Sequence, residues 1–251
     1  MRVARFGFNG EPRFGLVDGP ELILLKGHPL VNGYETSSER VAIKEVKLLA
    51  PTIPSKVVCI GKNYADHIAE MGLPTQPEPT IFLKPSSSII GPGDPIVLPR
   101  QSERVELEAE LAIVIGQIAK DVTVDSAMEY IWGFTVANDV TARDLQASDD
   151  QWARSKGFDS FCPIGPWIET EFVPEGQIIE SRINGEVQQA GTIDQMIHGV
   201  AEIVSYVSEN MTLLPGDIIL TGTPAGITTI SAGDIVECEV EGVGNLFNPV
   251  I

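Results

Sequence analysis

Short stretches of alternating apolar and polar residues, separated by glycine and proline, make up most of this chain. Residues 2–8 and 13–17 flank Asn9-Gly10, a dipeptide that favours a two-residue hairpin turn. Asn184-Gly185 predicts a second hairpin, over residues 178–188. Further apolar runs predict strands at residues 23–25, 56–60, 80–83, 105–115 and 133–138. The pattern is typical of a protein built mainly from short strands.

Three segments carry helix signals. Asn63 can cap a short helix that Gly72 would end. Residues 126–129 have capping-box spacing and predict a helix that reaches Trp132. The longest predicted helix spans residues 192–210. Its apolar residues recur on one face, which we expect to pack on the core: Met196, Val200, Ile203, Val204 and Val207.

Glycine and proline, which interrupt helices and strands, indicate the fold class and the domain organisation. The chain of 251 residues contains 24 glycines and 18 prolines, a density that favours many strands and loops over long helices. Pro51 and Pro54 predict a boundary between a small N-terminal β domain, residues 1–48, and a larger domain, residues 49–251. Residues 26–45 are polar and predicted to be irregular. The predicted class is α+β, strand-rich, with a rolled or barrel-like sheet.

Charge and cysteine content narrow the function classes. Asp and Glu number 35 against 17 Lys and Arg, a net charge of −18 that disfavours nucleic acid and anionic membrane surfaces. No apolar window approaches the ~18 residues of a membrane span. The three cysteines lie far apart without CxxC spacing, which favours a reducing, cytoplasmic location over a disulfide framework. A small anionic substrate would need local cations or a metal ion.

The strand at residues 105–115 is the most informative stretch. Its period of two places Glu106, Glu108 and Glu110 on one face, which becomes apolar at Ala112 and Val114. A solvated acidic face is the simpler interpretation. However, glutamates two apart repel each other, and their side chains can converge on one hard cation that prefers oxygen ligands.

Asp139 could supply a third carboxylate, because it follows an apolar strand. Position alone favours a helix N-cap at least equally. Arg143 and Gln146 follow at i+4 and i+7, and would share a helical face with Asp139. A surface ion pair between Arg143 and Asp139 is the alternative for that arginine.

His67 and Glu70 lie three residues apart on the short predicted helix, so their side chains are neighbours. They could form a base and the group that orients it, but spacing alone favours a surface pair. Lys84 and Lys156 lie in predicted loops, where a lysine is usually just solvated.

Six motifs that occur in one order favour functional roles for these residues over the surface alternatives. They are Gly61-Lys62-Asn63-Tyr64-Ala65-Asp66-His67, Phe82-Leu83-Lys84-Pro85, Glu108-Ala109-Glu110-Leu111-Ala112, Asn138-Asp139-Val140-Thr141-Ala142-Arg143-Asp144, Lys156-Gly157-Phe158-Asp159 and Thr221-Gly222-Thr223-Pro224-Ala225-Gly226. In this order the chain resembles the fumarylacetoacetate hydrolase family from about Pro51 to its end. The resemblance implies a mixed β roll, usually dimeric, with Mg²⁺ or Mn²⁺; Ca²⁺ is a further candidate.

The resemblance also implies roles for individual residues. Glu108, Glu110 and Asp139 match the metal-binding carboxylates. His67 and Glu70 match the dyad on a lid helix, and Lys156 matches a lysine that meets the substrate's oxo group. The remaining matches are pocket positions expected to bind substrate: Lys84, Arg143, Gln146 and Thr223.

The function expected from this resemblance is a metal-dependent reaction of a small anionic 2-oxo acid through a metal-bound enolate. Hydrolysis of an acylpyruvate or decarboxylation of oxaloacetate comes first. Isomerisation of a muconate-type or 2-hydroxyhepta-2,4-diene-1,7-dioate-type substrate is the alternative within the family. A non-catalytic metal-binding relative is the alternative from another class. We expect a homodimer without nucleic-acid or membrane partners.

Overall fold

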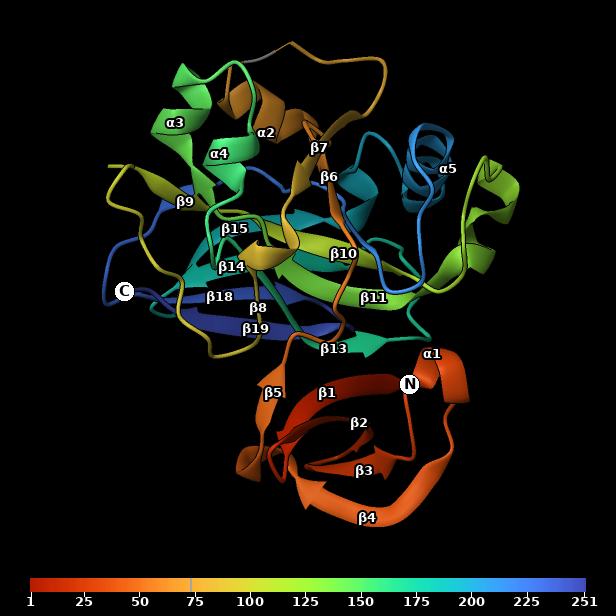
Figure 1. Cartoon of the computed structure of the whole chain (residues 1–251). Coiled ribbons are helices and arrows are strands. Elements are labelled where there is room, and N and C mark those ends of the chain that lie inside the picture. Colours follow the sequence, from red (N-terminus) through yellow and green to blue (C-terminus); the bar gives the residue numbers. More distant parts are fainter. Residues whose placement is uncertain (73) are drawn as a thin grey trace.

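The computed structural model describes residues 1–72 and 74–251. This part of the chain contains three β-sheets and five short α-helices, joined by loops (Figure 1). The largest sheet contains strands from both the N-terminal segment and the rest of the chain, in the order β4-β3-β2-β1-β13-β11-β10-β16-β6-β7. Most pairs are antiparallel, but β16 pairs with β6, and β13 with β8, in parallel. The predicted strand-rich α+β class is therefore confirmed.

The N-terminal strands β1 to β5 form one end of the large sheet, at the bottom of Figure 1. The predicted hairpin at Asn9-Gly10 is present, with φ of 51° and 82° at the turn. The prediction that residues 26–45 are irregular is wrong, because a polar edge strand pairs its backbone with β3. The elements are β1 Arg2–Phe8, β2 Glu11–Asp18, β3 Glu21–Leu25, α1 Pro29–Asn32, β4 Thr36–Ala42, the 3₁₀ helix Ile43–Glu45 and β5 Lys47–Leu49.

The rest of the large sheet carries most of the apolar strands. Its strands are β6 Val57–Gly61, β7 Thr80–Lys84, β8 Ile89–Ile90, β10 Ala109–Ile115, β11 Ile131–Asn138, β13 Cys162–Glu169 and β16 Ile218–Leu220. β1 pairs with β13, so the sheet is continuous across the predicted domain boundary. The division into domains at residue 48 stays a prediction.

Two smaller sheets complete the strand layers. One contains β9 Val105–Leu107, β12 Thr141–Ala142 and β17 Thr228–Thr229; the other contains β14 Ile178–Ile183, β15 Glu186–Thr192, β18 Ile235–Val240 and β19 Gly244–Pro249. The predicted hairpin at Asn184-Gly185 joins β14 to β15. The predicted single strand over residues 105–115 is interrupted at Glu108, so that β9 and β10 belong to different sheets.

The remaining helices of the described chain are short, and those predicted from sequence are shorter than expected. They are α2 Ala65–Glu70, α3 Arg143–Ser148, α4 Ala153–Lys156 and α5 Val200–Asn210, with 3₁₀ helices at Ser86–Ser88, Val124–Tyr130 and Ile193–Gln195. The capping-box segment is thus a 3₁₀ helix, and Trp132 lies in β11. Asn63 does not cap α2, because its side chain bonds to the backbone of His198 and Thr221. The longest helix begins at Val200, which leaves Met196 outside it.

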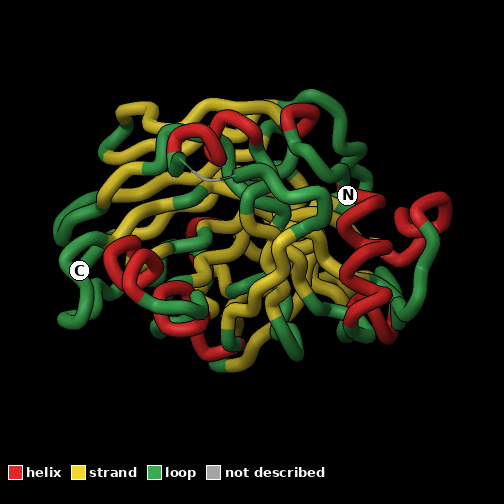
Figure 2. The backbone as a smooth tube through the Cα atoms, turned by 90° about the horizontal axis from the view of Figure 1, so that it is seen from above, coloured by secondary structure: helices red, strands yellow, loops and turns green. Residues whose placement is uncertain are grey.

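The core confirms the alternation predicted for residues 105–115. The six apolar residues of one face join the main hydrophobic cluster, which α5 covers through Ile203, Val204 and Val207. On the other face, Ala112 and Val114 belong to separate buried clusters. Seen from above in Figure 2, the strands fill the centre and the helices lie around them. None of the described helices combines the length and the hydropathy needed to cross a membrane.

Asp217, at the turn that enters β16, holds the start of β6 in place. Its buried carboxylate accepts hydrogen bonds from the backbone of Ser55, Lys56 and Leu214, and pairs with the Lys56 ammonium group. Burial alone would raise the pKa of Asp217, but these donors lower it below the usual value of 3.8. The charged form is therefore more favourable in the folded chain than in the unfolded one.

Asp217→Asn is expected to lower the free energy of unfolding by about 2 kcal/mol at pH 7, because charge-assisted hydrogen bonds are lost. The folded-state pKa is depressed, so this contribution is complete above the ordinary aspartate pKa and disappears as the pH falls through the folded value. Urea unfolding at pH 7 and at pH 3 checks both points. The exposed Asp125→Asn serves as control. An equal loss of stability at the two pH values would contradict the electrostatic explanation.

Candidate active site

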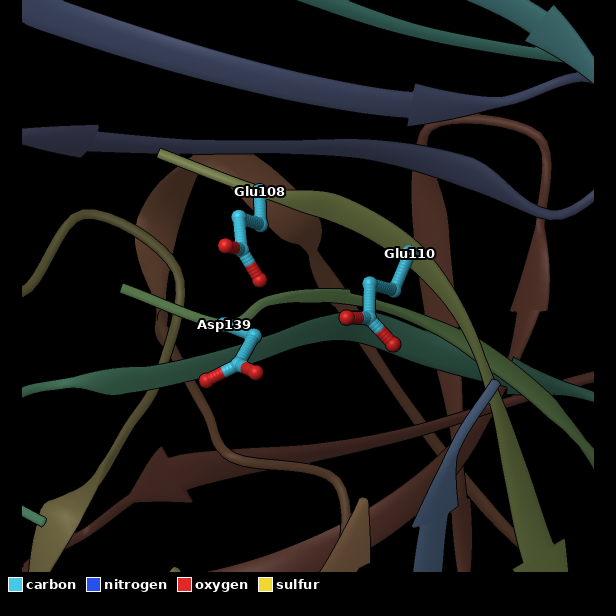
Figure 3. Close-up of side chains that lie close together, drawn as sticks. All are labelled: Glu108, Glu110 and Asp139. Atoms are coloured by element: carbon cyan, nitrogen blue, oxygen red, sulfur yellow. The ribbon is translucent and has the colours of Figure 1, made fainter. Parts of the chain in front are cut away.

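Three buried carboxylates meet where two strands of the large sheet end. Glu108 lies in the interruption between β9 and β10, Glu110 is on β10, and Asp139 follows β11. One oxygen of each lies within 4.8 Å of the others, and the three side chains point toward a common space (Figure 3). Each residue is at most 4% exposed, so the solvated acidic face considered from sequence is excluded for these positions.

Backbone pairing brings these residues together. β10 and β11 are antiparallel with Ala109 opposite Asn138, so the residues on either side of that pair are neighbours. The Asn138 Oδ1 accepts a hydrogen bond from Glu108 N (3.0 Å), and Asp139 N donates to Glu108 O (2.9 Å). Asp139 therefore lies beside Glu108 through the strand register. The N-cap alternative is wrong, because α3 begins at Arg143 with Ala142 at its N-cap position.

Two buried lysines contact these carboxylates. Lys156 Nζ, at the end of α4, lies 2.8 Å from Glu108 Oε2 and 2.7 Å from Asp139 Oδ2. Lys84 Nζ, at the end of β7, donates to Asp139 Oδ1 (2.5 Å) and to Val140 O (3.1 Å). Both side chains are at most 3% exposed. The expectation of ordinary solvated loop lysines is wrong for both, because each is buried against carboxylates.

Arg143 begins α3 and is also buried. Its guanidinium pairs with Glu106 Oε2 (2.6 Å) and with Glu108 Oε1, and it donates to Gln146 Oε1 (2.6 Å). The alternative of a surface pair between Arg143 and Asp139 is therefore wrong. Asp139 precedes β12 and does not share a helical face with Arg143 and Gln146.

Glu110 differs from the other two carboxylates in its partners. Among the described residues it pairs with no cation, and it accepts a hydrogen bond from Gly222 N (2.6 Å). Burial raises the pKa of Glu110 well above its usual range, and the charges of Asp139 and Glu108 raise it further. Burial acts the same way on Glu108, but the positive charges of Lys156 and Arg143 bring its pKa well below the usual range.

This donor set fits a divalent cation. Three converging carboxylates, one of them without a positive partner, present the hard oxygen ligands that Mg²⁺ and Mn²⁺ prefer. A bound cation would give Glu110 the charge partner that it lacks. Three protein ligands would leave such a cation free to bind substrate or water as well.

His67 and Glu70 form a pair on α2. His67 Nδ1 lies 3.2 Å from Glu70 Oε2, and the Glu70 carboxylate also accepts hydrogen bonds from Gly226 N. His67 is buried, which excludes the exposed surface pair favoured by spacing alone. Since Glu70 can only accept while ionised, Nδ1 carries the hydrogen and Nε2 is left as the basic nitrogen.

These groups border one pocket of about 460 Å³, including its open mouth. His67, the three carboxylates, Arg143, Gln146, Lys156 and Thr223 line it, together with Ile60, Gly61, Lys62, Ile68, Met71, Phe82, Trp152 and Gly222. Gly222 has φ of 99°, and a Cβ there would lie 2.8 Å from Asn63 Cβ. Only glycine lets this loop approach β6 and donate to Glu110.

The model of the fumarylacetoacetate (FAA) hydrolase C-terminal domain matches residues 56–251, and an N-terminal model named Rv2993c-like matches residues 1–51. The chain belongs to the fumarylacetoacetate hydrolase family. The resemblance of its six motifs to this family is confirmed, and so is the expected fold.

Named relatives of this family cover most or all of the chain. Protein Rv2993c of Mycobacterium tuberculosis is 53% identical and covers 100% of this chain and 98% of its own length. Human oxaloacetate tautomerase FAHD2A, mitochondrial, is 46% identical over 82% of this chain and 70% of its own. The solved structure of a 5-carboxymethyl-2-hydroxymuconate delta-isomerase from Mycobacterium smegmatis matches with a TM-score of 0.93, 44% identity and coverage of 100% and 99%.

The structure brings all ten predicted site residues of this family member together. Eight line the pocket, and Glu70 and Lys84 lie directly behind it, in contact with His67 and Asp139. Their roles in binding and catalysis remain predictions. The sequence interpretation missed Glu106 as the partner of Arg143, although its position on the same strand face as Glu108 was a usable signal.

Gln189 on β15 is a second residue that was missed. Its fully buried amide accepts from Ala109 N (2.9 Å) and donates to Thr223 Oγ1 and Pro224 O (2.7 Å each). It therefore ties the strand of Glu108 and Glu110 to the loop that contains Gly222. No sequence signal marks a lone glutamine of this kind, because all three partners are distant along the chain.

Gln189→Leu is expected to weaken Mn²⁺ binding about 10-fold, because groups that orient metal ligands contribute to affinity on that scale. Titration calorimetry with Mn²⁺ measures the change. Gln188→Leu, at the half-buried neighbouring position, is the control and should leave affinity unchanged. Equal Mn²⁺ affinity in wild type and Gln189→Leu would show that the carboxylates hold their positions without this link.

Proposed function

We propose that this family member is a divalent-metal-dependent enzyme that moves a proton between C3 and the 2-oxo oxygen of a small 2-oxo acid of the oxaloacetate type. The observation that carries the proposal is that His67, with Nδ1 held by Glu70, lines the same pocket as the three carboxylates. Proton transfer at carbon needs one positioned base and stabilisation of the enolate. Relatives named oxaloacetate tautomerase and hydroxymuconate isomerase support this branch of the family.

The carboxylates, His67 and Lys156 would each have a separate role in this reaction. A cation held by Glu108, Glu110 and Asp139 would supply Lewis-acid polarisation of the substrate's carboxylate and oxo group. His67 Nε2 would take a proton from C3, the electron pair of the broken C3–H bond would form the C2=C3 double bond, and the C2=O π pair would move to the oxo oxygen. The protonated His67 would then return the proton to that oxygen, which gives the enol and the neutral base. Lys156, the pocket-lining ammonium group between Glu108 and Asp139, would stabilise the negative charge on the oxo oxygen.

Hydrolysis and decarboxylation, placed first from sequence, are the second candidate. The same dyad could remove a proton from water instead of from carbon. A relative with a hydrolase name supports this candidate: the solved structure of the fumarylacetoacetate hydrolase from Exiguobacterium antarcticum is 38% identical, with a TM-score of 0.89. Both routes pass through an enolate at the same oxygen. Tautomerisation and hydrolysis differ in which atom gives its proton to His67, whereas decarboxylation needs no activated water.

A substrate panel tests the proposal. Purified enzyme with Mg²⁺ or Mn²⁺ should interconvert the keto and enol forms of oxaloacetate, followed by the ultraviolet absorbance of the enol, and EDTA should remove the activity. Acylpyruvate hydrolysis and release of CO₂ from oxaloacetate are measured in parallel, with metal alone as the blank. Tautomerisation no faster than the blank, with rapid hydrolysis, would replace the proposed reaction by the second candidate.

A further inference from the structure

Lys62 is a pocket-lining cation that the proposed chemistry does not use. It occupies the connection between β6 and α2, is half-buried, and borders both the site pocket and a neighbouring hollow. Among the described residues, no carboxylate oxygen lies within 4.0 Å of its ammonium group. The other lysine and the arginine that line the pocket, Lys156 and Arg143, both pair with the metal-site carboxylates.

The local backbone fixes Lys62 at this position. Its φ of 61° lies in the left-handed region, which is uncommon for residues other than glycine. The next residue, Asn63, is buried and anchors the connection through hydrogen bonds to Thr221 O (2.8 Å) and to His198 O and N (3.0 and 2.8 Å). The hydrogen bonds of Asn63 therefore hold the backbone of this connection beside the pocket that Lys62 lines.

The charges around the pocket indicate a role for Lys62. The three metal-site carboxylates and the Glu70 carboxylate beside His67 outweigh Lys156 and Arg143 by two negative charges, and the Lys84 and Glu106 charges behind them cancel. A divalent cation would then bring the site to neutrality, with His67 neutral as a base requires. Each substrate carboxylate adds one negative charge, and Lys62 is the pocket-lining Lys or Arg of the described chain that no carboxylate already pairs with, so it can compensate a carboxylate that lies away from the cation.

We propose that Lys62 binds the distal carboxylate of the substrate, so that the site selects dicarboxylic over monocarboxylic 2-oxo acids. This inference rests on the proposed function for the orientation of the substrate, with its 1-carboxylate and oxo group at the metal end. One carboxylate competes for the lysine. Glu78 lines the neighbouring hollow, where it accepts a hydrogen bond from Tyr206 (3.4 Å), yet no ion pair joins it to Lys62.

The test compares oxaloacetate with its 4-methyl ester, which keeps the metal-end groups and loses the distal charge. In Mn²⁺-loaded enzyme, Lys62→Met should raise KM for oxaloacetate about 10- to 100-fold, the range for one charge-assisted interaction, with little change in kcat. KM for the ester should stay within twofold, and Lys62→Arg should restore most of the preference for the diacid. Lys44→Met, an exposed lysine in the N-terminal segment, is the control.

Two results would overturn the inference: no change in KM for either compound, as expected if Lys62 pairs with Glu78 in solution, or an equal change for both. Failure of the proposed function is a separate outcome, seen as absence of turnover in the wild type. Calorimetric binding of the same two compounds then gives the comparison without turnover. A 10-fold or greater loss of oxaloacetate affinity in Lys62→Met, with the ester unaffected, would support Lys62 even in that case.

Discussion

Glu110→Gln is expected to weaken Mn²⁺ binding by on the order of 100-fold or more and to abolish turnover, without destabilising the metal-free protein. Stability is expected to persist because, among the described residues, Glu110 lacks a positively charged partner. Glu110 has no cation beside it in the described structure, so a neutral amide of the same size removes repulsion with Glu108 and Asp139. Calorimetric titration with Mn²⁺ measures the affinity, and urea unfolding measures the stability.

Glu108→Gln provides the contrast. It should lose metal affinity to a similar extent, but it also leaves Lys156 and Arg143 without their shared carboxylate. Breaking a buried pair of this kind costs about 3–5 kcal/mol of stability. The two variants therefore separate a metal ligand from a structural charge partner.

Thermal unfolding provides an independent measure. Mn²⁺ should raise the Tm of the wild type, because a ligand that binds only the folded state stabilises it, and should leave the Tm of Glu110→Gln unchanged. The exposed Glu103→Gln is the control and should respond like the wild type. Wild-type Mn²⁺ affinity in Glu110→Gln would remove this carboxylate from the metal site.

The shared strand face of Glu108 and Glu110 could be predicted because the information is local. A period of two fixes which side chains of residues 105–115 share a face, and the apolar Ala112 and Val114 indicated that this face becomes interior, as the structure confirms. The Asn-Gly turns were predictable for the same reason, since two adjacent residues determine the turn. The order of the six motifs then pointed to Asp139, whose proximity to Glu108 depends on strand register.

The errors arose where tertiary partners override local preference. Asn63 has the side chain of a good N-cap, but its amide bonds to segments more than 130 residues away. Residues 36–42 look irregular because an edge strand needs only a backbone partner, and β3 supplies one. The partners of Arg143 and Lys84 are likewise distant, so their burial cannot be read from the sequence around them.

His67→Ala is expected to lower kcat for proton transfer at carbon by about 10²–10⁴, the usual effect of removing a general base. Metal affinity should be unchanged, because the three carboxylates remain. Glu70→Ala should act in the same direction, since it removes the acceptor that holds the Nδ1 hydrogen and the Gly226 amide. His198→Ala, whose side chain pairs with Glu202 at 3.7 Å outside the pocket lining, is the control.

The three reactions respond differently, and this makes His67→Ala the sharper of the two tests. Tautomerisation and acylpyruvate hydrolysis each need a base, for the C3 proton or for water, whereas cleavage of CO₂ from oxaloacetate needs no activated water. Residual decarboxylation beside loss of the other two activities would therefore support His67 as the base. Wild-type tautomerisation in His67→Ala would assign the base to another pocket group, and loss of hydrolysis alone would show that the dyad acts on water.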